Sequence, residues 1–263
     1  MLYLFYLLIC VAATTIGAIS GIGGGVLIKP VMDAVGGMGV SAISFLSGCT
    51  VLAMSVVSLL RSRGGEVKLE PRRGTPLALG GAVGGVAGKG VFDAVKASFG
   101  NDALLGAIQS GLMIVLTLGV LVYVLGKSRI RARDVRGALP CLAIGLGLGV
   151  LSAFLGIGGG PINLAVLYYC FSMDTKTAAL HSLYIILFSQ TASLLSTLLQ
   201  SRVPAFDPVT LAVMAGGGIV GGFVGRAFNK KMSPGQVDSL FRALLVVITA
   251  ISCYNLWRYG GML

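Results

Sequence analysis

Gly21-Ile22-Gly23-Gly24-Gly25 occurs twice in this chain, and the second copy is Gly156-Ile157-Gly158-Gly159-Gly160. The two copies lie 135 positions apart, and each follows an apolar segment, residues 2–19 in one case and 139–155 in the other. Glycine-rich composition alone does not place identical pentapeptides after matching apolar segments. We therefore asked whether the rest of the chain follows the same offset.

The likeness between the two halves extends beyond the glycines. The offset of 135 positions aligns Ser47 with Ser182. After an insertion of two residues, the stretch 84–89 (Gly-Gly-Val-Ala-Gly-Lys) aligns with 221–226 (Gly-Gly-Phe-Val-Gly-Arg). Self-similarity at a fixed offset is the signature of a duplicated unit.

Four glycines in five residues are expected to break an α-helix, because each costs about 1 kcal/mol relative to alanine in a helix interior. Within a bilayer, irregular backbone is tolerated only where protein or a water-filled cavity satisfies the freed N–H and C=O groups. Paired glycine-interrupted segments at matching positions of two halves are typical of a transporter's binding site. The alternative is that the glycines only let helices pack closely.

Composition indicates an integral membrane protein. The chain is 56% hydrophobic and 11% charged, with a mean hydropathy of +0.93, far from the balance of a soluble domain. Apolar runs of about 18 residues or more indicate membrane spans. The net charge of +11 is concentrated in residues 61–73 and 126–137. Because these stretches flank apolar spans, we interpret the charge as a topology signal and not as a nucleic-acid surface.

The sequence predicts an all-α polytopic membrane protein with about eight transmembrane helices. Four belong to a first repeat, residues 1–125, and four to a second repeat, 138–263, with a basic linker, 126–137, between them. A segment too short to cross alone follows each glycine break. The expected spans are 1–20, 40–60, 76–88, 104–125, 138–155, 177–199, 209–225 and 239–257.

Charge also predicts orientation, because cytoplasmic loops carry an excess of Lys and Arg. We expect the linkers 61–73 and 126–137 on the cytoplasmic side of the cell (inner) membrane, and the N-terminus there too. The loop with Arg226, Lys230 and Lys231 falls outside in this count. An inverted second half would bring that loop inside, but inversion requires an odd number of crossings in each half. We favour the simple eight-span count and leave inversion open.

The glycine breaks are the strongest candidate site. Backbone N–H groups at the start of a helix lack intrahelical partners and lie at the positive end of its dipole, so they bind anions. Glycine also lets a ligand approach the backbone closely. Asn163 is polar in an apolar run and faces either the ligand or another helix. The substrate-binding candidates at the breaks are Gly23, Gly24, Gly25, Gly158, Gly159, Gly160 and Asn163.

The spans that follow the breaks add polar candidates, namely Ser47, Thr50, His181, Ser182 and Gln190. Hydroxyls in membrane helices often bond their own backbone, so a structural role is the alternative for each. His181 is the only histidine; it either exchanges a proton near neutral pH or makes a neutral interhelical hydrogen bond. Lys29 either attracts an anion or extends to the membrane interface, and we favour the interface.

The sequence shows no catalytic or metal-binding arrangement. Paired carboxylates are missing from the expected spans, and no Ser–His–Asp or metal-ligand pattern occurs, so we predict neither an enzyme nor a cofactor. The five cysteines are scattered through apolar segments without a CxxC pair. We expect them to be packing residues, with a redox role as the alternative.

The chain resembles the TauE/SafE family of membrane permeases, also called the sulfite exporter family. The resemblance rests on the duplicated four-span unit, each copy of which opens with Gly-x-Gly-Gly-Gly, here residues 21–25 and 156–160. It covers essentially the whole chain and implies transport of sulfite, sulfoacetate or related organosulfur anions. Lys29 departs from the apolar residue expected at its position, which bears on the charge of the substrate.

We therefore expect a membrane permease or exporter for a small anion, a sulfur oxyanion or a sulfonate, bound between the two broken segments. Its partners are that anion and the lipid bilayer, with no nucleic acid, and we leave homo-oligomerisation open. The alternative is a membrane scaffold or assembly factor that transports nothing. Because the expected spans contain almost no acidic residues, we expect export driven by the membrane potential, with His181 modulating its pH dependence.

Overall fold

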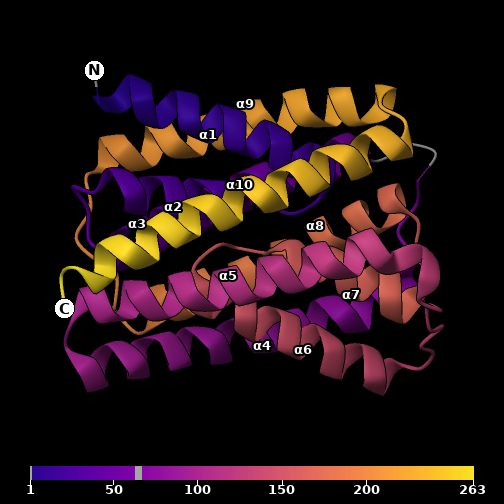
Figure 1. Ribbon diagram of the computed structural model, residues 1–263, viewed down its shortest axis with the longest axis horizontal. Helices are drawn as coiled ribbons and strands as arrows, with labels where there is room; N and C mark the ends of the chain where they lie inside the picture. Colours follow the sequence, from indigo (N-terminus) through magenta and orange to yellow (C-terminus); the bar gives the residue numbers. More distant parts are fainter. Residues whose placement is uncertain (1, 63–66) are drawn as a thin grey trace.

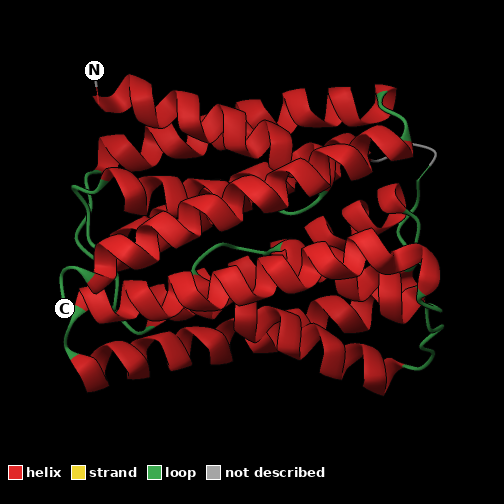
Figure 2. Cartoon of the chain, in the orientation of Figure 1, coloured by secondary structure: helices red, strands yellow, loops and turns green. Residues whose placement is uncertain are grey.

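The computed structural model describes residues 2–62 and 67–263. Within these ranges the chain is helical and contains no strand (Figure 2), which confirms the all-α class predicted from the sequence. A short 3-10 helix, η1 (Lys127–Arg129), follows the fifth α-helix. The α-helices are α1 (Leu2–Ser20), α2 (Gly25–Val35), α3 (Val40–Ser62), α4 (Pro71–Phe99), α5 (Asp102–Gly126), α6 (Ala138–Leu155), α7 (Pro161–Phe171), α8 (Thr175–Leu199), α9 (Pro208–Lys231) and α10 (Pro234–Gly260).

Seven of these helices are long and apolar enough to cross a membrane, in agreement with a polytopic membrane protein. The α4 helix has 29 residues, but its glycines and charged side chains lower its hydropathy. The α2 and α7 helices have 11 residues each and are too short to cross alone, as the sequence predicts.

The α1 and α2 helices form a hairpin that enters the bundle from one end and returns to it (Figure 1). The start of α1 lies beside the start of α9, where Tyr3 interacts with Asp207. The C-terminal end of α2 lies beside that of α10, where Arg258 Nη1 donates to the carbonyl oxygen of Ala34 at 2.8 Å. We call this end of the bundle, where α1 begins and α10 ends, the terminal end.

The α6 and α7 helices form the matching hairpin from the opposite end. The segment that leads into α6 runs beside the end of α7, with backbone hydrogen bonds from Arg133 to Tyr169 (2.6 Å) and from Val135 to Cys170 (2.8 Å). The α8 and α10 helices begin at this end as well. We call it the basic end, because it carries the basic linkers of the sequence.

The two halves of the chain are inverted relative to each other. Each half combines one hairpin with three helices that run between the ends, α3 to α5 in the first half and α8 to α10 in the second. Because a hairpin makes no net crossing, each half crosses an odd number of times. Our preference for the simple count over the inverted arrangement is therefore wrong. The simple count did not include the α2 and α7 helices as crossings because they are short. They nevertheless return the chain to the end at which α1 and α6 began.

Glycine-rich faces hold each hairpin against a helix of the other half. A Cβ added at Gly84 in α4 would overlap the carbonyl oxygen of Leu146 in α6, and one at Gly217 in α9 would lie 2.8 Å from the Cβ of Cys10 in α1. Only glycine allows helix backbones to approach this closely. The repeated glycines thus interlock the halves, with α4 on α6 and α9 on α1.

The two basic linkers and the basic C-terminal turn of α9 gather at one end of the bundle. Arg73 at the start of α4 pairs with Asp134 at 2.6 Å, which joins the two basic linkers. Arg61 lies over the ring of Phe223, 4.8 Å from its centre, so the basic C-terminal turn of α9 is at the same end. Inversion therefore removes the charge violation of the simple count. It also means that the N-terminus and the linkers cannot both be cytoplasmic, as we had expected, because they lie at opposite ends.

We predict that the basic end faces the cytoplasm, because the positive-inside rule then holds for both basic linkers and for the basic C-terminal turn of α9. In a variant without native cysteines, Ser98→Cys and Ser201→Cys should react with an impermeant thiol reagent added outside intact cells. Ser233→Cys should react only after permeabilisation. All three positions are exposed, so burial does not limit the reaction. Equal labelling of Ser98→Cys and Ser233→Cys from outside would contradict the inverted arrangement.

Candidate functional site

The two glycine breaks meet inside the bundle, where the tips of the hairpins touch. A Cβ added at Gly25 would overlap the carbonyl oxygen of Ile157, and one at Gly159 would lie 3.0 Å from the carbonyl oxygen of Ile22. One at Gly23 would lie 3.6 Å from the backbone of the second break. Segments from the two halves are therefore in backbone contact at the position where the sequence analysis placed the site.

Glycine is also required by the backbone conformation of the breaks. The φ angle is +88° at Gly23, +67° at Gly158 and +143° at Gly159, a region that residues with a Cβ rarely adopt. These conformations turn the chain sharply from α1 into α2 and from α6 into α7.

Both short helices begin at the breaks without a capping side chain. The residue before α2 is Gly24 and the residue before α7 is Gly160, and neither supplies a side-chain cap. The first N–H groups of a helix have no intrahelical partner and form the positive end of its dipole. Because the tips touch, two positive helix ends converge inside the bundle. Such donors are suited to a small anion.

Each tip packs on a helix of the opposite half at equivalent positions. A Cβ added at Gly21 would overlap Ala179 in α8, and one at Gly156 would overlap Ser44 in α3. Ser44 and Ala179 are 135 positions apart, the offset of the sequence repeat. The tips are thus enclosed symmetrically, which satisfies the requirement that irregular backbone in a membrane be surrounded by protein.

Buried polar side chains without partners accompany the breaks. Ser47 Oγ lies 2.9 Å from the position of a Cβ on Gly25, and Ser182 occupies the equivalent position in the second half. Neither hydroxyl, nor either amide atom of Asn163, has a hydrogen-bond partner among the described residues. Buried polar groups normally have hydrogen-bond partners. These groups can therefore still form hydrogen bonds with a ligand.

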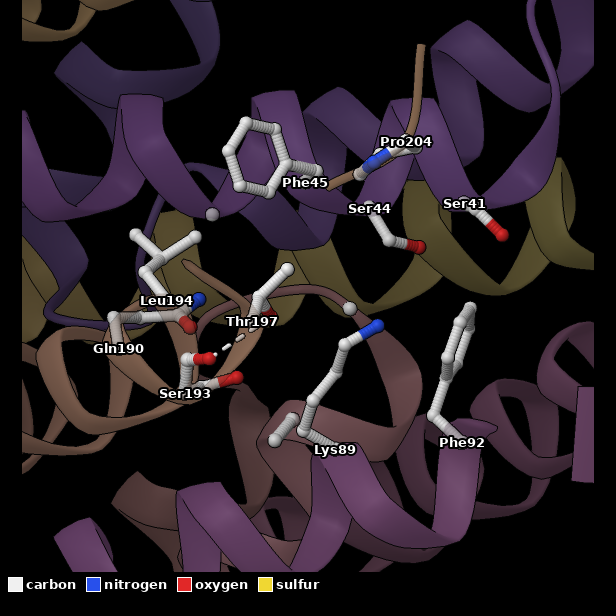
Figure 3. A pocket seen from close by; sticks show the side chains of 13 residues that line it. Ser41, Ser44, Phe45, Lys89, Phe92, Gln190, Ser193, Leu194, Thr197 and Pro204 are labelled. Atoms are coloured by element: carbon white, nitrogen blue, oxygen red, sulfur yellow. Dashed lines mark hydrogen bonds between the residues drawn. The ribbon is translucent and has the colours of Figure 1, made fainter. Parts of the chain in front are cut away.

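A cavity beside the second break is lined by side chains from both halves of the chain (Figure 3). Ser41 and Pro204 are at its outer side, whereas Gln190 contacts Gly158 of the break. Its polar lining consists of hydroxyls, one amide and one lysine. The cavity is lined by Ser41, Ser44, Phe45, Gly48, Lys89, Phe92, Ala153, Gly156, Gln190, Ser193, Leu194, Thr197 and Pro204.

Lys89 in α4 is the cation of this cavity, and the sequence analysis did not list it as a site residue. Its side chain extends toward the serines of α3 (Figure 3), and its Nζ lies 2.9 Å from Asp93 Oδ1. Arg202 approaches the same carboxylate at 3.4 Å, so two cations share one acid and the group carries a net positive charge. A signal was present in the sequence, because the repeat aligns Lys89 with Arg226.

Two of the predicted site residues do not contact the breaks. The Thr50 hydroxyl donates to the carbonyl oxygen of Leu46 at 2.8 Å, within its own helix. His181 Nε2 accepts from the backbone N–H of Glu70 at 3.1 Å, and its Nδ1 pairs with the carbonyl oxygen of Thr177 at 2.9 Å. These contacts favour the structural alternatives that the sequence analysis gave for both residues.

Lys29 does not extend to the interface, so that preference is wrong. Its Nζ lies 2.7 Å from Asp33 Oδ2, and the side chains are only 4% and 5% exposed. The two residues are four positions apart on α2, a spacing that brings side chains together on a helix. The pair neutralises both charges locally, whereas Lys89 lines the cavity that also includes Gly156 of the second break.

We predict that Gly25→Ala destabilises the protein by about 1–3 kcal/mol or more, the usual cost of overpacking, because its Cβ would meet backbone of the other break. Gly160→Ala is the matched control. Its φ of 176° is extended, and the nearest atom to its Cβ is the flexible Ile157 Cδ1 at 3.2 Å, so its effect should be small. Thermal unfolding in detergent measures both, and equal effects would contradict the contact between the tips.

We also predict that His181→Gln lowers stability by about 0.5–1.5 kcal/mol for each hydrogen bond lost and leaves the pH dependence of transport unchanged. The reason is that Nε2 joins α8 to the start of α4 through Glu70, while Nδ1 is held by the carbonyl oxygen of Thr177 within α8. Thermal unfolding and a pH profile of flux in liposomes provide the two measurements. A flattened pH profile at unchanged stability would restore the role in pH dependence that the sequence analysis expected.

Comparison with known proteins identifies the family. The family described as "Sulfite exporter TauE/SafE" matches residues 6–254. A "Probable membrane transporter protein" of Xylella fastidiosa (strain 9a5c) is 26% identical over 165 residues, which is 59% of this chain and 62% of that protein, less than two thirds of its length. No solved structure matches the chain. Because the family match covers nearly the whole sequence, the chain belongs to the sulfite exporter TauE/SafE family.

Proposed function

We propose that this protein is a permease for a small anion, whose path crosses the contact between the two glycine breaks. The observation that carries the proposal is the convergence of two uncapped helix N-termini, those of α2 and α7, inside the bundle. Backbone N–H groups and helix dipoles at such a point favour negative charge. The family and the printed name of the relative support the broader class, a membrane transporter.

The lining of the cavity supports an anionic substrate in particular. Lys89 is its only charged residue, and the polar remainder consists of hydroxyls and the amide of Gln190 among the described residues. A carboxylate would repel an anion, and Asp93, which lies behind Lys89, is shared with a second cation. We propose a path in which Lys89 attracts the anion at the terminal end and the breaks bind it deeper in the bundle.

A sulfur oxyanion or sulfonate is the substrate class that we propose. The family name refers to sulfite, and the sulfonate group presents three oxygens that hydroxyls, an amide and backbone N–H groups can contact together. Ser47, Ser182 and Asn163 supply buried polar groups of this kind. Glycine at the tips allows the oxygens to approach the backbone donors.

We propose that transport is driven by the membrane potential and proceeds outward through the cell (inner) membrane. Moving one charge across the membrane is worth about 2.3 kcal/mol per 100 mV, so export of an anion from a negative interior is downhill without a coupling ion. The buried carboxylate of Asp33 is paired with Lys29, which argues against a free acid for cation coupling on α2.

We predict that purified protein in liposomes carries radiolabelled sulfite in response to an imposed potential. Lys89→Gln should raise the KM for sulfite about tenfold, because a hydrogen bond to a charged group is worth about 1.5–3 kcal/mol. Lys89→Arg keeps the charge and should retain most of the flux. Arg242→Gln removes a cation at the basic end and is the matched control for net charge.

Two outcomes would contradict this function. Absence of flux for sulfite, sulfate and methanesulfonate under every imposed gradient would favour a scaffold whose glycines only pack helices. Equal loss of flux in Lys89→Gln and Arg242→Gln would show that net charge and not the cavity determines transport.

A further inference from the structure

Arg226 in α9 is a buried cation with no carboxylate partner among the described residues. It is 6% exposed, its Nη1 donates to Asn229 Oδ1 at 3.1 Å, and its Nε has no hydrogen-bond partner. None of the ion pairs found between described residues includes it. A buried charge without a counter-charge is strongly disfavoured, so Arg226 has unfilled capacity for an anion.

The repeat relates Arg226 to Lys89, and helix packing preserves the relation. In the first half, α4 packs on α8 with Gly85 against Ser189. In the second half, α9 packs on α3 with Gly222 against Met54. A Cβ added at Gly222 would lie 3.0 Å from the carbonyl oxygen of Met54. Ser189 is the repeat mate of Met54, so both helix pairs have the same register. One turn further along, each helix carries its cation.

This register places Arg226 level with polar residues on α3. They are the repeat mates of residues that line the Lys89 cavity. Lys89 shares that cavity with Gln190, Ser193 and Thr197, whose repeat mates on α3 are Ser55, Ser58 and Ser62. The hydroxyls of Ser55 and Ser58 are fully buried and have no hydrogen-bond partner in the described part of the chain. The basic end therefore has the same kind of polar cluster as the terminal end, but Arg226, Ser55 and Ser58 are buried and do not line the cavity found at this end, whose lining includes Ser62 and Leu59.

The counter-charge differs between the two clusters. In the first half, Asp93 lies one turn after Lys89 and pairs with it at 2.9 Å. The equivalent residue of the second half is Lys230, so Arg226 has a second cation where Lys89 has an acid. An anion at the basic end would therefore meet a stronger positive field.

We propose that Arg226, Ser55 and Ser58 form a second binding site for the transported anion at the basic end, related to the Lys89 cavity by the inverted repeat and closed in this structure. The inference rests on the proposed function and extends it to a second binding site for the anion. Inverted repeats allow two such states to interconvert by rocking of one set of helices against the other. Opening at the basic end would then expose Arg226 as the Lys89 cavity closes.

The test measures protection of single cysteines by methanesulfonate, a sulfonate that does not react with thiol reagents. Ser58→Cys reports the basic-end site, and Ser193→Cys, its repeat mate, reports the open cavity. Both are made without native cysteines and treated in detergent with a cationic methanethiosulfonate, so that both ends are accessible. Ser58→Cys should react more slowly because its position is fully buried, and methanesulfonate should slow both reactions.

The charge variants then separate the two sites. Arg226→Gln should raise the methanesulfonate concentration that protects Ser58→Cys about tenfold and leave protection of Ser193→Cys unchanged, whereas Lys89→Gln should do the reverse. Arg226→Lys should keep most of the protection. Asn229→Ala removes both the hydrogen bond to the carbonyl oxygen of Ile19 at 2.6 Å and the acceptor of Arg226 Nη1 but keeps the cation, so protection of Ser58→Cys should persist if the charge binds the anion.

Several results would overturn the inference. If only Ser193→Cys is protected, the second site fails while the proposed function stands; if neither cysteine is protected, both fail. Equal loss of protection in Asn229→Ala and Arg226→Gln would show that Arg226 helps to hold α9 against α1 and does not bind the anion. Glu66 lies outside the described residues and is tested as Glu66→Gln: protection of Ser58→Cys that appears only when this carboxylate is removed would show that Arg226 belongs to an internal ion pair, and would overturn the inference.

Discussion

The backbone contact between the two glycine breaks is the constraint on which the rest of this structure depends. Gly25 at the tip of one hairpin touches the backbone of Ile157 at the tip of the other, so each hairpin is positioned by its partner. Hydrocarbon cannot satisfy the open backbone of the tips, and α3 and α8 enclose them from opposite halves. The absence of Cβ atoms lets the tips approach and also leaves helix-starting N–H groups accessible. Close packing and anion binding, which the sequence presents as alternatives for these glycines, are compatible in a single arrangement.

The features that could be predicted from the sequence are those that depend on local chemistry or on the repeat. The position of the breaks follows from the cost of glycine in helices, and the close α4–α6 and α9–α1 contacts follow from glycines spaced by four residues. The direction of the second half could not be predicted in this way. It depends on whether α2 and α7 return beside α1 and α6, which is decided by contacts such as that of Arg258 with Ala34, distant in the sequence. Once the return is known, both basic linkers and the loop with Arg226, Lys230 and Lys231 fall at one end, so this loop no longer violates the charge rule.

The candidate site shows the same division between local and distant information. Ser47 lies against Gly25 as the repeat suggested, and the Lys29–Asp33 pair has a helical spacing that could have been recognised from the sequence. His181 was a reasonable candidate because ionisable groups in membranes are usually functional. Its actual partner, the backbone N–H of Glu70, is 111 positions away and leaves no trace in the sequence. Lys89 was overlooked because it follows a glycine-rich stretch that indicated helix packing, although its alignment with Arg226 was visible.

The inverted repeat makes the backbone path symmetric, but the charges along it are not. Lys89 shares Asp93 with Arg202, whereas the repeat places Lys230 where a partner for Arg226 would stand. If the basic end faces the cytoplasm, as we predict from the positive-inside rule, the more strongly positive cluster faces the compartment from which the membrane potential expels anions. Capture of a dilute anion there requires a strong field, whereas release on the other side requires a weaker one, because an anion held equally tightly at both ends would leave slowly. At the exit, a carboxylate partly offsets the charge of the cation. At the entrance, the cation has no such offset among the described residues. The export that we propose requires this unequal distribution of charge along a symmetric scaffold.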